Sequence, residues 1–78
     1  MTDTNEIRAL KASFRGVQAT AAALDALREK VQSLDDHGEI SEADLEELGR
    51  ITSAHAVASQ ALRGLVVTMR NRRTAAAS

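Results

Sequence analysis

The sequence predicts an all-α fold, in which two long helices pack as an antiparallel, coiled-coil-like helical hairpin. The prediction rests on helix-spaced apolar residues in both halves of the chain, a break around Gly38, and a register that matches the two halves. Apolar residues three or four apart mark one face of a helix. In the first half these are Ile7, Leu10, Phe14, Val17, Ala21, Leu24, Leu27, Val31 and Leu34. In the second half the stripe, with one histidine, is Leu45, Leu48, Ile51, His55, Ala58, Leu62, Leu65 and Met69.

The two stripes come into register when the chain is folded back at Gly38. Leu10 then lies opposite Met69, and His55 lies opposite Leu24. Each stripe also contains one additional step of three residues, and both steps fall at the same level. Because the stripes match along their whole length, we expect the helices to pack from the turn to the termini.

Capping residues mark the expected ends of the first helix. Asp3 is a favourable N-cap, and Glu6 three residues later is its capping-box partner. The first helix is therefore expected over about 4–34, followed by a turn at 35–40. In that turn Gly38 can adopt the left-handed conformation that commonly ends helices.

The second helix has its own start signal. Ser41 is its expected N-cap, and the helix is expected over about 41–73. The segment 74–78 is expected to fray, as chain ends commonly do. The hairpin forms one small domain over residues 1–78.

Composition excludes several classes of protein. The chain has no cysteine, so disulfide and thiol chemistry are excluded, and no apolar run approaches the ~20 residues of a membrane span. Its start is acidic and polar, unlike a secretory signal. No glycine-rich phosphate loop or oriented nucleophile is visible. We expect a cytoplasmic protein that is not an enzyme and has no cofactor, no small-molecule substrate and no membrane contact.

Small residues predict self-association. They recur at helical spacing on the side of the first helix away from its apolar stripe, and beside the seam on the second helix. Small residues there let another helix approach closely, although alanine also fills exposed helix positions as the best helix former. The residues expected to form this surface are Ala12, Gly16, Ala19, Ala23, Val57, Ala61 and Gly64. We expect a homodimer, most simply a four-helix bundle, and contact with another protein. Gly16→Leu or Ala61→Leu should then disrupt assembly.

Charge is divided between the two ends of the predicted rod. The end with the termini carries a net charge of +5, and the turn end carries −6. The cations are Arg8, Lys11, Arg15, Arg63, Arg70, Arg72 and Arg73. Opposite poles favour antiparallel docking of two hairpins. The basic end also supports an alternative function, a dimeric nucleic-acid-binding regulator that contacts phosphates, although Phe14 is the only aromatic residue available for stacking on bases.

The turn resembles the calcium-binding loop of EF-hand proteins over Ser33 to Leu45, with Gly38 at the sixth position. The ligand positions that the resemblance implies are Ser33, Asp35, His37, the Glu39 carbonyl, Ser41 and Asp44. The family has aspartate at the first position and glutamate at the twelfth, where this chain has Ser33 and Asp44. The adopted interpretation is a capped acidic turn without a metal.

His55 is the one histidine on the predicted seam. No second histidine or carboxylate lies one turn away on its face, which disfavours a metal site. We expect a structural histidine that is hydrogen-bonded across an interface. A pH-sensitive role is the alternative, because protonating a histidine in an apolar layer is costly.

The function expected from these observations is that of a small protein–protein interaction module. Such a module, an adaptor, inhibitor or assembly factor, acts through helix–helix contacts.

Overall fold

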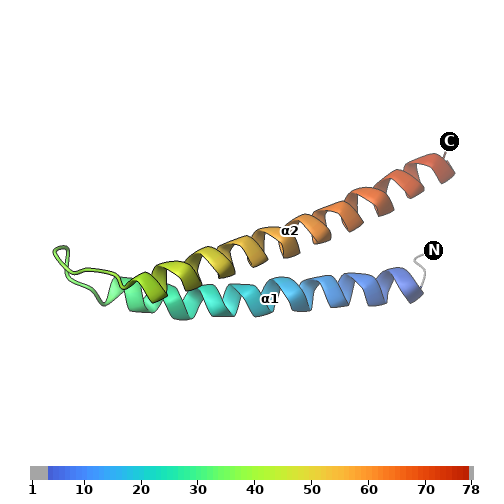
Figure 1. Ribbon diagram of the computed structural model, residues 1–78. Coiled ribbons are helices and arrows are strands. Elements are labelled where there is room, and N and C mark those ends of the chain that lie inside the picture. The colour runs from blue at the N-terminus through green and yellow to red at the C-terminus, as the bar shows by residue number, and fades with distance from the viewer. Residues whose placement is uncertain (1–3, 78) are drawn as a thin grey trace.

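The protein folds as two long helices that lie side by side and run in opposite directions (Figure 1). The computed structural model describes residues 4–77. Helix α1 spans Thr4–Gln32 and helix α2 spans Glu42–Ala77. The molecule is a rod of 59 × 20 × 17 Å. The predicted all-α antiparallel hairpin is confirmed.

The turn is slightly longer than expected. Helix α1 ends at Gln32, because the N–H of Leu34 donates to the Val31 carbonyl three residues back (3.1 Å) and leaves the α-helical pattern. At the start of α2, the backbone N–H of Asp44 donates to the Ser41 hydroxyl (3.1 Å). This bond confirms Ser41 as the N-cap, since a cap satisfies a free N–H of the first helical turn.

Helix α2 continues to Ala77, past the expected end at residue 73. The segment expected to fray is therefore helical as far as the structure describes it. The Thr74 hydroxyl donates to the Arg70 carbonyl at 3.0 Å, and the alanines that follow are the strongest helix formers. The predicted first N-cap, Asp3, lies outside the described residues.

Gly38 does not have the predicted left-handed conformation, since no glycine among the described residues has a positive φ. It is required in the turn for a different reason. Its N–H donates to the Asp35 carbonyl at 2.8 Å, and a Cβ at position 38 would lie 3.0 Å from that oxygen. The close approach of backbone to backbone favours glycine here.

The seam between the helices follows the prediction over most of α2 and less closely on α1. On α2 the residues that turn inward are Leu48, Ile51, His55, Ala58, Leu62, Leu65 and Met69, as expected. On α1 the inward residues are Glu6, Leu10, Ser13, Val17, Thr20, Leu24 and Leu27. Five residues expected in the seam are between 41% and 50% exposed, so that part of the prediction is wrong: Ile7, Phe14, Val31, Leu34 and Leu45.

Polar contacts explain why α1 is rotated about its axis relative to the expected packing. Thr20 bonds to His55, and Glu6 pairs with Arg72, and both contacts require these α1 side chains to face α2. In a pair of helices, each helix covers only one stripe of residues on the other. With Ser13 and Thr20 in that stripe, Ile7 and Phe14 fall beside it.

The helices lie close together beside the turn and diverge toward the chain ends (Figure 1). Among the described residues, three side chains are buried, namely Leu27, Ile51 and Met69. Within residues 4–77, no helical stretch combines the length and apolar character that a membrane span requires.

Candidate interaction surfaces

A hydrogen bond joins the middles of the two helices, where the Thr20 hydroxyl lies 2.7 Å from His55 Nδ1. The same hydroxyl lies 3.0 Å from the Val17 carbonyl and 3.2 Å from that of Gly16. A hydroxyl has one proton to donate, so it either donates within α1 and accepts from the imidazole, or donates to the imidazole. His55, expected opposite Leu24, is thus hydrogen-bonded to Thr20 across the hairpin. A pH-sensitive role for His55 stays a prediction.

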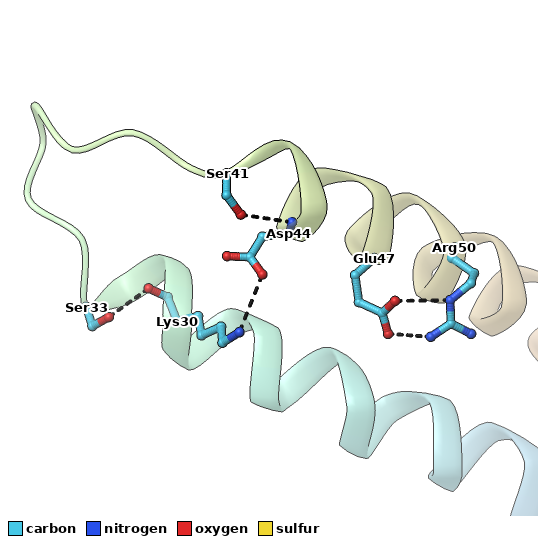
Figure 2. Close-up of polar contacts among 6 residues, drawn as sticks. All are labelled: Lys30, Ser33, Ser41, Asp44, Glu47 and Arg50. Atoms are coloured by element: carbon cyan, nitrogen blue, oxygen red, sulfur yellow. Dashed lines mark hydrogen bonds and ion pairs between the residues drawn. The ribbon is translucent and has the colours of Figure 1, made fainter.

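Ionic contacts hold the turn end together, as Figure 2 shows. Lys30 of α1 reaches across to Asp44 of α2, with Nζ and Oδ1 3.4 Å apart. Glu47 and Arg50 pair one turn apart on α2 itself. The hydrogen bond and the negative charge of Glu47 raise the pKa of Arg50.

The side chains at two ligand positions of the EF-hand resemblance make contacts within the hairpin. Asp44, the last ligand position of the resemblance, binds Lys30, and the Ser41 hydroxyl caps α2. Among residues 4–77, no group of three or more histidines and carboxylates could hold a metal ion.

At the basic end, Arg72 of α2 forms an ion pair with Glu6 of α1. Arg72 Nη1 lies 3.1 Å from Glu6 Oε1 and ties the diverging helices together. Five other cations make no ion pair with another described residue: Arg8, Lys11, Arg15, Arg63 and Arg70. All five are exposed. They are available to a ligand, but they lie on two helices with apolar residues between them.

The small residues predicted to mediate association lie together on one side of the seam. In an antiparallel pair of helices, residues at the same position of the seven-residue repeat lie on the same side of the seam. The small residues of α1 and those of α2 therefore face the same way. We call this the small-residue face: Ala12, Gly16, Ala19, Ala23, Val57, Ala61 and Gly64. Val57 is 70% exposed, and a Cβ on Gly16 or Gly64 would meet nothing within 4 Å. The hairpin itself does not cover this face.

The opposite side of the seam carries larger apolar side chains, which the sequence analysis did not recognise as a surface of their own. We call it the bulky face: Ile7, Phe14, Ala21, Leu45 and Val66. Apart from Ala21, these side chains are between 39% and 50% exposed. One sequence signal could have revealed the bulky face. Ile7, Phe14 and Ala21 are seven residues apart, so they form a single row along the helix beside the seam.

Two shallow grooves run along the bulky side, one near each end of the rod. The groove near the termini is lined by Leu10, Val66, Met69, Arg70 and Arg73. The groove near the turn is lined by Leu24, Asp25, Arg28, Val31, Gln32 and Leu48. Both have apolar floors formed by seam residues. Their charged rims differ, since the first is basic and the second is of mixed charge.

Comparisons with protein-family models, with curated proteins and with solved structures found no significant match.

Proposed function

We propose that this protein is a small non-enzymatic interaction module, an adaptor, inhibitor or assembly factor, that acts through helix–helix contacts with other chains. A second copy of itself is the first such partner. The proposal rests on the balance of burial, since within residues 4–76 three residues are buried while eight large apolar residues are exposed. Monomeric soluble proteins rarely leave so much of their apolar surface uncovered.

The surface area supports the same proposal. The chain exposes 6227 Å², about a third more than the roughly 4,600 Å² expected for a compact protein of 8.3 kDa. That excess, about 1,600 Å², is twice the ~800 Å² that one partner contributes to an interface of standard size. Contacts with other chains would bury this surplus.

The test is whether assembly stabilises the fold. Light scattering should give about twice the chain mass of 8.3 kDa. The midpoint of thermal unfolding should rise over a roughly hundredfold increase in protein concentration, because mass action favours an associated native state. A chain that stays monomeric and unfolds at one temperature at every concentration would contradict the proposal.

Nucleic-acid binding is a second candidate, favoured by the five cations of the basic end that have no ion-pair partner within residues 4–77. Contacts with phosphates release counterions, so binding to DNA or RNA should weaken steeply as salt rises. Replacing Arg8, Lys11 and Arg15 by glutamine should weaken binding and flatten its salt dependence. Absence of any gel shift with DNA and RNA at low salt would exclude this function.

A further inference from the structure

We propose that the bulky face is the docking site for a second copy of this chain, arranged antiparallel, so that the end with the termini of each protomer covers the turn end of the other. This inference rests on the proposed function and adds the face, the occupant and the orientation. In this arrangement each helix packs against its own copy in the partner.

The first argument is the pattern of charge beside the bulky face on α1. Lys11, Gln18 and Asp25 are seven residues apart, so they form one row along the helix. Lys11 lies within one turn of both Ile7 and Phe14, which places the row along the edge of the bulky face. The row is basic at one end and acidic at the other, with Gln18 in the middle. Turned end over end, it presents Lys11 to Asp25 of the second copy, and Asp25 to Lys11.

The second argument is that α2 carries a row with the same property. Glu42, Gly49, Ala56, Arg63 and Arg70 are again seven residues apart, and Val66 of the bulky face lies between the last two. The row is acidic near the turn and basic near the termini, with Ala56 in the middle. End-over-end docking brings Arg70 of each copy to Glu42 of the other. In an arrangement with matched ends, the termini of both copies would lie at the same end of the dimer. Like charges would then lie together, which is destabilising.

The two rows share one centre, and this third argument comes from the tertiary structure. The contact between Thr20 and His55 sets the relative height of the two helices. Gln18 and Ala56 then lie within about 3 Å of each other along the rod, at 1.5 Å per residue. One two-fold axis across the rod at this level therefore satisfies both rows. Such an isologous contact closes on itself and gives a dimer.

The apolar residues fit the same axis. At this register Phe14 meets the small Ala21 of the second copy, and Leu45 meets Val66. On α1 the large Phe14 thus faces a small residue, and on α2 side chains of moderate size meet. The basic groove lined by Val66 and Arg70 comes to lie over the turn end of the other copy, where Asp25 lines the second groove.

A charge exchange tests the pairing across the dimer. Lys11→Glu should raise the dimer dissociation constant about tenfold, because symmetry replaces two attractive pairs by two repulsive ones. Adding Asp25→Lys should restore the constant to within about threefold. Residues 11 and 25 are about 21 Å apart along one helix, well beyond the screening length of physiological salt. Rescue therefore requires two chains.

The matched control combines Lys11→Glu with Asp36→Lys, which has the same net charge but places the new cation in the exposed turn. This variant should stay as weak as Lys11→Glu alone. Equal rescue by Asp36→Lys would show that net charge alone matters, and would overturn the proposed pairing. Tighter association of Lys11→Glu would also overturn the proposed pairing. That result would indicate that residue 11 lies beside cations of the second copy, as it does in an arrangement with matched ends.

Distances between spin labels test the orientation directly, since the chain has no cysteine and accepts single labels. Labels on Gln18→Cys, at the proposed axis, should lie close together. Labels on Asn71→Cys should be separated by about 45 Å along the rod, because residue 71 lies fifteen residues from the centre at Ala56. With matched ends, both pairs of labels would lie within the cross-section of the bundle.

The outcomes separate this inference from the proposed function. A dimer with near Gln18 labels and distant Asn71 labels supports both. A dimer with two short distances, or with distant Gln18 labels, overturns the antiparallel docking and leaves the interaction module in place. A monomer at all concentrations contradicts both.

Discussion

The two sides of the hairpin seam differ in the kind of helix packing that they allow. The small-residue face has alanines and glycines that would let a helix backbone approach closely. The bulky face has Ile7, Phe14, Leu45 and Val66, edged by rows of charge that reverse along the rod. Burial of apolar area is the main driving force of association in water. Larger side chains supply more of that area, and ordered charge selects an orientation, so the comparison favours the bulky face for the second copy.

The largest effect is expected from a carboxylate in the centre of the bulky face. Phe14→Glu should raise the dimer dissociation constant by about a hundredfold or more, equivalent to ~3 kcal/mol, because an unpaired charge would be desolvated. Phe14 is half exposed in the hairpin, so helicity should persist. Sedimentation equilibrium measures the constant. Val57→Glu on the small-residue face is the matched control and should change the constant little, and a reversed order of effects would refute the comparison.

A smaller effect is expected in the seam that separates the faces. Thr20→Val keeps the shape of the side chain but removes the hydroxyl that bonds to His55. The half-buried imidazole then loses a partner, which should cost about 1 kcal/mol of unfolding free energy. Urea denaturation of Thr20→Val, His55→Leu and the double variant measures their coupling. Strictly additive losses would show that this hydrogen bond does not stabilise the hairpin.

Glycine substitutions show whether the small-residue face is covered in the assembly. Gly16→Ala and Gly64→Ala should each stabilise the protein by about 1 kcal/mol, because alanine is the better helix former and its Cβ meets nothing within 4 Å. Gly38→Ala, where the Cβ approaches the Asp35 carbonyl, should instead destabilise it by about 1 kcal/mol. A loss of stability in the Gly16 or Gly64 variant would indicate close packing of another helix on this face.

The smallest effect is expected from leucine on the small-residue face, and here two predictions oppose each other. Association through the small-residue face predicts that Gly16→Leu or Ala61→Leu disrupts assembly. Docking through the bulky face predicts an unchanged mass by light scattering, because these positions then stay exposed. Loss of the dimer in both variants, with Phe14→Glu still dimeric, would return the interface to the small-residue face.

Much of the architecture was predictable because helix spacing is a local property. The antiparallel hairpin and the Ser41 cap follow from apolar periodicity and capping chemistry, and both are confirmed. The inward stripe of α2 also follows, since His55 and Met69 face the seam as expected. The inward stripe of α1 was predicted less well. The most apolar side of α1 is not the side that α2 covers. Thr20 and Glu6 turn toward α2 instead, because their polar partners His55 and Arg72 lie on that helix.

The sequence by itself determined the two helices, the turn and the division of charge between the ends, because these depend on the order of residues along the chain. The tertiary structure alone decided which α1 side faces α2, and therefore that Ile7 and Phe14 lie beside the seam. It also decided that the Lys11–Asp25 row of α1 and the Glu42–Arg70 row of α2 are centred at one height. Rotation about a helix axis and the relative height of two helices depend on contacts between residues far apart in the chain, here Thr20 with His55 and Glu6 with Arg72. Periodicity within one helix does not contain that information.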